Sequence, residues 1–304
     1  MTYQSLVGTL VHLAVLLAFG PIPATAASQQ PVTVSMRPYR GTRSVVAVKL
    51  NGAGPYDFMV DTGATVTVLD AALFQELGLR AEGASHVASS AGATDQILSV
   101  VQEITLDSLT ARNITVVSMK SSMTGIGYYG LRGILGENFL RHFDILLDNQ
   151  HRRIILDAGE NLADSLDGEH LPITFPSVSQ GRENQYQPMI SVTVQAYGQA
   201  SLLLDSGATS LVILQWRKRL QASVTEMRLR TVNGSLPCES TNDRVSLGKG
   251  TVSDFMILKC QSETVKPQEH TGVLPTAIFK EIFISHAGSY AIINPLQRGN
   301  ARGL

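Results

Sequence analysis

Two stretches of the sequence repeat one another at a distance of 144 residues. Phe58–Asp70 reads FMVDTGATVTVLD and Ser201–Ile213 reads SLLLDSGATSLVI, so that Asp61 corresponds to Asp205 without a gap. In each copy an apolar run, typical of a buried strand, ends in Asp, a hydroxyl residue, Gly and Ala. Such an in-register repeat indicates a fold built from two equivalent halves.

The segments around each aspartate also follow the same order. Upstream, Val45–Val60 and Met189–Leu204 both read as strand, turn, strand. Downstream, Gly133–Leu156 and Gly272–Asn294 both begin with Gly, a β-branched residue and Leu. Apolar residues at helical spacing then predict a short helix in each half, through Phe139, Leu140 and Phe143 in the first and Ile278, Phe279 and Ile282 in the second.

The doubled motifs Asp61-Thr62-Gly63-Ala64 and Asp205-Ser206-Gly207-Ala208, each answered later by an apolar-apolar-Gly turn, resemble the aspartic proteases. The Ala after Gly in both copies is similar to the retropepsin-like branch, whereas two copies in one chain are similar to the bilobal pepsins. The resemblance covers about Val45 to Asn294. It implies a mainly β fold of two pseudo-symmetric acid-protease-type β-barrel lobes, with a cleft between them.

The resemblance implies that Asp61 and Asp205 are the catalytic dyad of an endopeptidase. Two carboxyls about 3 Å apart cannot both ionise, so they share one proton and activate one water between them. The Thr62 and Ser206 hydroxyls are expected to bond across to the opposite loop, and Gly63 and Gly207 to allow its close approach. Because Ala64 and Ala208 offer no hydroxyl donor to the charged dyad, we expect a less acidic working range than that of the pepsins.

Two other interpretations of the aspartates stay open at this point. One Asp-Thr-Gly alone is often only a turn, since Asp and Thr bond their own backbone. Both aspartates would then cap turns in a structural envelope β-protein. Alternatively the chain is a catalytically silent peptide-binding protein with the same bilobal fold.

The segments expected to act as flaps are Gly83–Gln96 in the first half and Thr231–Thr241 in the second. Neither contains the Tyr that a pepsin flap carries. The usual flap contact is therefore not expected here.

The first 26 residues differ in kind from the rest. The apolar run Leu6–Gly20 is followed by Ala24-Thr25-Ala26, small residues typical of a cleavage site, so residues 1–26 are predicted to be a signal peptide. An uncleaved membrane anchor is the alternative. The N-terminal lobe is expected to span residues 27–167 and the C-terminal lobe 168–304, joined within a polar, turn-rich linker at Asp157–Pro188. The protein is then expected to be exported, either periplasmic or secreted.

Cysteine, histidine and charge content bound the other expectations. Cys238 and Cys260 are the two cysteines, and in an exported protein they can form a disulfide across a hairpin that turns near Gly248–Gly250; two separate thiols are the alternative. The seven histidines lack metalloprotease spacing, so no metal and no cofactor are expected. A net charge of −1 without a basic block does not favour nucleic acid. The expected partner is a peptide or protein in extended conformation, bound by a monomer that does not contact the membrane after signal removal.

Overall fold

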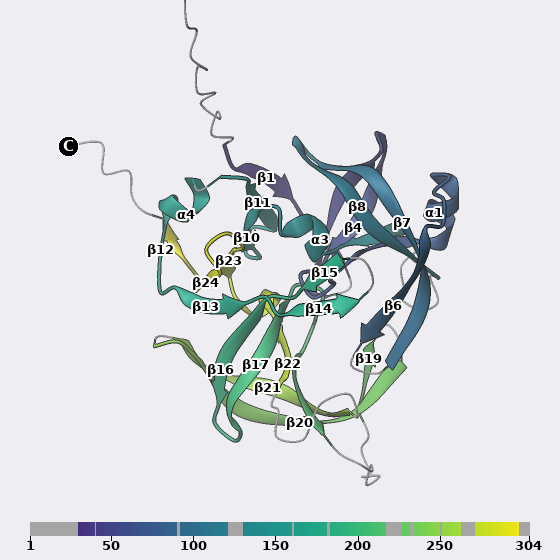
Figure 1. Ribbon diagram of the computed structural model, residues 1–304. Helices are drawn as coiled ribbons and strands as arrows, with labels where there is room; N and C mark the ends of the chain where they lie inside the picture. The colour runs from purple at the N-terminus through teal and green to yellow at the C-terminus, as the bar shows by residue number, and fades with distance from the viewer. Residues whose placement is uncertain are drawn as a thin grey trace, which may run out of the picture.

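The computed structural model is mainly β (Figure 1). It describes residues 30–39, 41–89, 92–120, 130–159, 161–180, 183–216, 227–231, 234–249, 251–262 and 271–297. The expected signal peptide, residues 1–26, lies outside the described residues. The strands form a 13-stranded sheet, an eight-stranded sheet and two two-stranded ribbons.

The first half carries the whole eight-stranded sheet, three strands of the 13-stranded sheet and two short helices. Its strands are β1 (Val32–Ser35), β2 (Arg37–Tyr39), β3 (Arg43–Leu50), β4 (Ala53–Val60), β5 (Thr67–Asp70), β6 (Gly83–Ser89), β7 (Gly92–Leu106), β8 (Leu109–Met119), β9 (Leu131–Leu135), β10 (Asp144–Asp148) and β11 (Arg153–Asp157). Its helices are α1 (Ala71–Glu76) and α3 (Glu137–Leu140). Helix α1 begins where it does because the Asp70 carboxylate accepts the amides of Ala72 and Leu73 at 2.8 and 2.9 Å.

The second half has more strands than the first and little helix. Its elements are α4 (Asn161–Ser165), β12 (Leu166–Asp167), β13 (Leu171–Thr174), β14 (Ser177–Gln180), β15 (Glu183–Tyr186), β16 (Met189–Val194), β17 (Gly198–Asp205), β18 (Leu211–Trp216), β19 (Met227–Thr231), β20 (Gly234–Leu247), β21 (Thr251–Ser262), β22 (Thr271–Pro275), the 3₁₀ turn η2 (Thr276–Ile278), β23 (Glu281–Ser285), β24 (Tyr290–Ile293) and β25 (Leu296–Gln297).

The sequence repeat is also a repeat of strand pairing. In the first half β3 pairs antiparallel with β4, β4 runs parallel to β9, and β5 lies between β9 and β8. In the second half β16 pairs antiparallel with β17, β17 runs parallel to β22, and β18 lies between β22 and β21. In both copies, therefore, the aspartate lies at the end of a strand that has one antiparallel and one parallel neighbour.

The two halves are joined through a shared part of the larger sheet. Strand β10 of the first half pairs with β23 near the end of the chain, through Ile145 opposite Ile284, and β1, β11, β24 and β13 extend this layer on either side. Strand β10 is buried at all five positions, as expected for a central strand covered on both faces. One hydrophobic core cluster accordingly includes residues of both halves, among them Phe58, Ile145, Leu202 and Ile284.

The structure corrects the helix predicted after Gly272. Only the single 3₁₀ turn η2 forms there, and Phe279 returns to an extended conformation at φ −97° and ψ 150°. The cause is the early start of β23 at Glu281, which pairs with Asp148 of β10 and leaves no room for a second turn. The first half has the longer connection before β10 and therefore keeps the four-residue helix α3.

The segment expected to be a linker, Asp157–Pro188, contains regular structure. Leu171 and Ile173 of β13 are buried while their neighbours Pro172 and Thr174 are exposed, which is the period-2 pattern of a half-buried strand. Leu162 of α4 also joins a small core cluster. Isolated apolar residues thus pack this otherwise polar segment against the strands that the two halves share.

A buried ion pair lies where the two halves meet. The His286 Nε2 atom is 3.0 Å from Glu137 Oε2, and His286 Nδ1 is 2.6 Å from the carbonyl oxygen of Phe143. Burial lowers the pKa of His286, but the Glu137 charge and both hydrogen bonds outweigh it, with a contribution from Asp144, so that the pKa lies above its usual value. Because both ring nitrogens face acceptors, the imidazole is held as a cation that ties α3 to the segment after β23.

Replacing this histidine should therefore weaken folding in a pH-dependent way. We expect His286→Gln to lower the free energy of unfolding by about 3 kcal/mol at pH 5, because a buried carboxylate loses its partner. A raised folded-state pKa gives stability that is complete below about pH 6.5 and is lost as pH rises through that pKa, so the deficit should shrink by pH 9. Urea unfolding at both pH values measures it. The matched double variant His286→Gln/Glu137→Gln should recover part of the loss, and an equal deficit at pH 5 and 9 would contradict the cationic pair.

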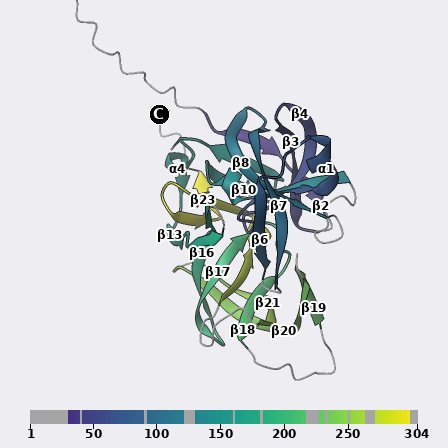
Figure 2. The same cartoon turned by 45° about the vertical axis from the view of Figure 1, so that its right-hand side comes forward.

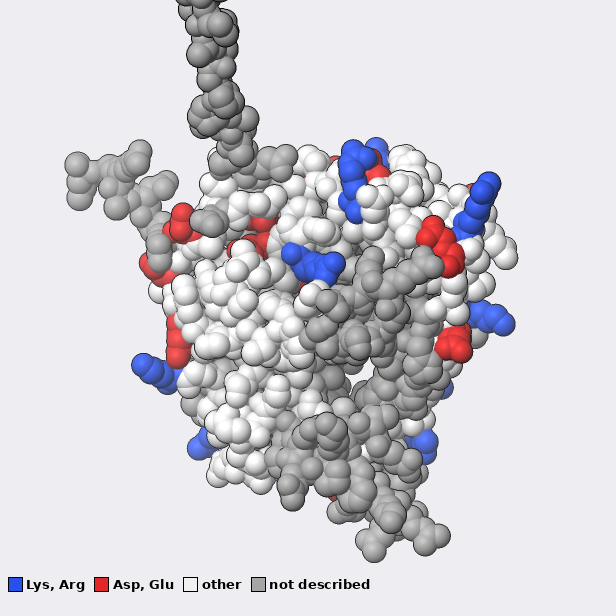
Figure 3. Space-filling view, in the orientation of Figure 1, with Lys and Arg blue, Asp and Glu red and all other residues white. Residues whose placement is uncertain are grey.

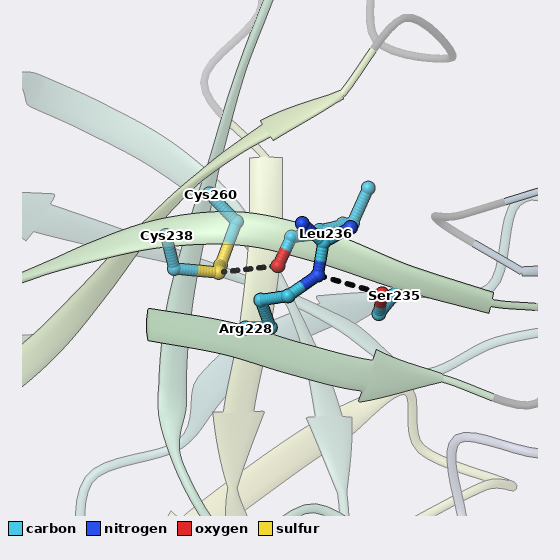
Figure 4. The surroundings of a disulfide bond; sticks show 5 residues. All are labelled: Arg228, Ser235, Leu236, Cys238 and Cys260. Carbon is cyan, nitrogen blue, oxygen red and sulfur yellow. Dashed lines mark hydrogen bonds between the residues drawn. A yellow bond between two sulfur atoms is a disulfide. The ribbon is translucent and has the colours of Figure 1, made fainter. Parts of the chain in front are cut away.

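Cys238 and Cys260 form a disulfide across the β20–β21 hairpin (Figure 4). The two residues face one another in the antiparallel register, with their Cα atoms 4.1 Å apart. Both side chains are buried beside Leu214, Leu236 and Leu258. The bridge therefore links β20 to β21, and Leu214 of β18 packs in the same cluster.

Opening this disulfide should destabilise the second half. It closes a loop with a sequence separation of 22, and the loss of such a restraint costs about 3 kcal/mol in the chain-entropy account. We expect the urea midpoint to fall when reductant is added, and Cys238→Ala/Cys260→Ala to unfold at the lower midpoint with or without reductant. An unchanged midpoint for both would show that the hairpin is held by its ladder alone.

Candidate active site

The two repeated aspartates lie at equivalent strand ends. Asp61 directly follows β4, and its amide donates to the Leu135 carbonyl oxygen at 3.1 Å. Asp205 is the last residue of β17, in register with Pro275 of β22. Pairing with a parallel neighbour, β9 for β4 and β22 for β17, therefore fixes the position of each aspartate at the end of its strand.

The loops that carry the aspartates are bonded to one another four times. The Thr62 hydroxyl donates to the Leu204 carbonyl oxygen at 2.8 Å and accepts the Ser206 amide at 3.0 Å. In return, the Ser206 hydroxyl donates to the Val60 carbonyl oxygen at 2.9 Å and accepts the Thr62 amide at 3.1 Å. Because each hydroxyl is buried and acts as both donor and acceptor, the two loops hold each other in one relative position.

Each carboxylate is held by amides of its own loop. Asp61 Oδ1 accepts the amides of Gly63 and Ala64 at 2.9 and 3.1 Å. Asp205 Oδ1 accepts the amides of Gly207 and Ala208 at 2.7 and 2.9 Å. The two carboxyls are thus oriented alike, each with Oδ2 turned away from these donors.

Each carboxyl also lies against the glycine of the opposite loop. A Cβ atom at Gly63 would be 2.5 Å from Cγ of Asp205, and one at Gly207 would be 2.5 Å from Oδ2 of Asp61. These approaches are shorter than any real Cβ contact, so only glycine fits at both positions. The four residues expected to support the dyad, Thr62, Gly63, Ser206 and Gly207, are therefore brought together with Asp61 and Asp205.

The environment of the pair favours the protonated form of both carboxyls. Burial raises the pKa of Asp61 well above its usual range, and the charge of Asp205 together with a hydrogen bond between the two carboxyls raises it further. Burial also raises the pKa of Asp205, while the loop amides, the bond from Asp61 and the charge of Arg43 act in the opposite direction. A protonated carboxyl beside an ionised one provides an acid and a base within one site.

Further polar contacts stiffen the first loop from behind. The Asn138 side-chain oxygen accepts the amide and the hydroxyl of Thr67 at 2.9 and 2.8 Å, and the Thr67 hydroxyl accepts the amide of Gly136. The amide of Glu137 donates to the Ala64 carbonyl oxygen at 2.7 Å. Asn138 was not singled out in the sequence, because a lone Asn in a helix gives no pattern to follow.

Arg43 and Gln187 are two further residues that the sequence pattern did not single out. Each donates to the carbonyl oxygen of a motif glycine, Arg43 to Gly207 and Gln187 to Gly63. The same separation of 144 residues links them, two positions before the repeat that the apolar pattern reveals. Because the two residues differ in type, no repeated identity in the sequence marks them.

The described part of the chain contains one group of side chains with the spacing of a metal site. Ligand atoms of Asp148, His151 and Glu281 lie within 4.8 Å of one another. Asp148 is already paired with His151 and Arg153: burial raises its pKa, but these donors outweigh it and hold the pKa below its usual value. The group is thus an ion pair at the β10–β11 turn, remote in sequence from both aspartate loops.

Comparison with known proteins gives one family match. Residues 46–142 match the family model described as "gag-polyprotein putative aspartyl protease". This span contains the Asp61 loop and the Gly133–Asn138 segment behind it. No curated protein matches the sequence.

Solved structures include a similar chain as well. The crystal structure of a retropepsin-like aspartic protease from Rickettsia conorii has 18% sequence identity and a TM-score of 0.31, covering 42% of this chain and 88% of its own.

Proposed function

From the premise that residues 46–142 carry the sequence of an aspartyl protease family, we propose that this chain is an aspartic endopeptidase in which one chain supplies both catalytic carboxyls. The observation that carries the proposal is the reciprocal bonding of Thr62 and Ser206, which holds each aspartate against the glycine of the other loop. A structural turn needs neither the second loop nor the glycine contact across it.

The proposed reaction uses one water and the shared proton. The ionised carboxyl takes a proton from the water as its oxygen attacks the peptide carbonyl carbon, and the protonated carboxyl gives its proton to the carbonyl oxygen. When the tetrahedral diol collapses, the C–N bond breaks, the nitrogen receives the proton held by the carboxyl that acted as base, and the other carboxyl recovers its proton from a diol hydroxyl. The pair ends as it began, with one proton, so no other acid or base is required.

We propose that two hairpins border the bound peptide. The β6–β7 hairpin extends from the first half towards the β19–β20 hairpin of the second in both views (Figures 1 and 2). These hairpins correspond to the segments predicted to be flaps. An extended peptide can add main-chain hydrogen bonds to strand edges of this kind, which gives affinity for backbone, while side-chain pockets give selectivity.

The test of the proposed activity is cleavage of a peptide library by the purified chain between pH 3 and 8, with products identified by mass. Peptide-bond cleavage that disappears in Asp61→Asn is the expected result. Peptides that are bound but not cut at any pH would favour the silent binding protein. Neither binding nor cleavage would favour the structural β-protein.

We further propose that the protein is exported and acts as a monomer. The support is the apolar segment Leu6–Gly20 with Ala24-Thr25-Ala26 behind it, and a chain that holds both aspartates. Among the residues that the structure describes, none of the helices has the length and apolar character needed to cross a bilayer. Among the described residues on the face drawn in Figure 3, basic and acidic side chains are interspersed and form no single-sign patch. Intact mass after expression in a secreting host should show the loss of residues 1–26, and retention of Met1 would contradict export with cleavage.

A further inference from the structure

The two aspartate loops are equivalent in backbone but not in charge. Arg43, the first residue of β3, donates from Nε to the Gly207 carbonyl oxygen at 2.6 Å. Gln187, just before β16, donates from Nε2 to the Gly63 carbonyl oxygen at 3.3 Å. The two contacts are related by the repeat, so a cation stands beside one loop where a neutral amide stands beside the other.

The cation lies on the side of Asp205. Gly207 is two residues from Asp205 in the same tight loop, and the Arg43 charge favours the ionised form of that carboxyl, which lowers its pKa against the effect of burial. The neutral Gln187 gives Asp61 no such support. Behind the Asp61 loop, the amide of Glu137 donates to the Ala64 carbonyl oxygen, and the carboxylate of Glu137 is paired with His286.

We propose that Arg43 is a positioning residue that breaks the symmetry of the pair, so that the shared proton resides on Asp61 and Asp205 is the ionised member. This inference rests on the proposed function, which leaves the two roles unassigned. Asp205 then takes the proton from the attacking water, and Asp61 gives its proton to the carbonyl oxygen of the substrate. After collapse of the diol, the proton held by Asp205 passes to the leaving nitrogen and Asp61 recovers its own from the diol hydroxyl.

The repeat itself supplies the variants that test this assignment. Arg43→Gln makes the two sides alike, and Arg43→Gln/Gln187→Arg moves the cation to the side of Asp61. The location of the proton is read from the carboxyl-carbon NMR signals of protein labelled with ¹³C at aspartate, assigned with Asp61→Asn and Asp205→Asn. Urea unfolding of each variant verifies that it is folded.

Over the pH range in which the pair holds one proton, the wild-type chain should show Asp205 at a carboxylate shift and Asp61 at an acid shift. The swap variant should show the two shifts exchanged, and Arg43→Gln should bring them closer together. The same assignment in wild type and swap variant would overturn the proposal.

The pH dependence of cleavage gives a second readout that a merely structural role would not move. In Arg43→Gln the acid limb of kcat/KM should move to higher pH by about one unit, because Asp205 loses a stabilising cation. Arg43→Lys, which keeps the charge, should leave the limb near its wild-type position. An unmoved limb in Arg43→Gln would count against the proposal. If no variant and no wild-type protein cuts any peptide, the proposed function fails, and the NMR measurement still decides where the proton lies.

Discussion

Asp61→Asn and Asp205→Asn should each reduce kcat/KM for peptide cleavage by about four orders of magnitude or more. Members of a cooperating catalytic unit fail together, because the remaining carboxyl cannot serve as acid and base in the same step. An Asn at either site still accepts the loop amides, so the backbone geometry of the loop should survive. Steady-state kinetics at the pH optimum of the wild type measure the loss.

The same variants should gain stability at neutral pH. A carboxyl whose pKa is raised by folding stabilises the native state below its unfolded-state pKa and loses that contribution as pH rises through the folded value. At pH 7 the wild-type chain therefore bears the cost of holding a proton on Asp61 and of burying the charge of Asp205, and Asn removes one of these costs in each variant. Loss of activity together with an equal or higher urea midpoint would separate a catalytic role from a folding role.

A matched control is available on the same strand. Asp57 of β4 is half-buried and paired with Arg37 at the surface. Asp57→Asn should change kcat/KM by less than about twofold, since surface pairs contribute little. Wild-type turnover in Asp61→Asn, or a loss in Asp57→Asn as large as in the dyad variants, would contradict the assignment of the site.

The repeat made the centre of the site predictable, because each motif residue has one backbone task that its type reveals. In both copies a hydroxyl residue, Thr62 or Ser206, is followed by glycine, so the same contacts are expected of each loop. The contacts of Arg43 and Gln187 escaped notice because different side chains perform them, so no residue identity repeats. The Glu137–His286 pair joins positions 149 apart with no local pattern at all.

Long-range pairing also limited what could be predicted of the fold. The alternation of apolar residues marks β10 and β23 as strands, but it does not say that they pair with each other across the halves. That pairing in turn set the early start of β23 and reduced the predicted helix to η2. The family likeness predicted a mainly β chain with equivalent halves, and the shared layer between them is visible only in three dimensions.

Alanine at Gly63 or Gly207 should disable the site without removing any catalytic group. The added Cβ would lie 2.5 Å from the carboxyl of the opposite aspartate, so that carboxyl must move by about 1 Å, and displacement on this scale costs about a hundredfold in rate. Overpacking should also lower the free energy of unfolding by about 1–3 kcal/mol.

Because the contacts are reciprocal, Gly63→Ala displaces Asp205 and Gly207→Ala displaces Asp61. The two variants should therefore lose similar activity. Gly159→Ala should keep both activity and stability, because its Cβ would meet only side-chain atoms, the Asn161 amide at 3.2 Å and the Asp157 carboxylate at 3.5 Å. If Gly63→Ala and Gly207→Ala cleave peptides as fast as the wild type, the two carboxyls do not work against the opposite loops, and the site is not a dyad.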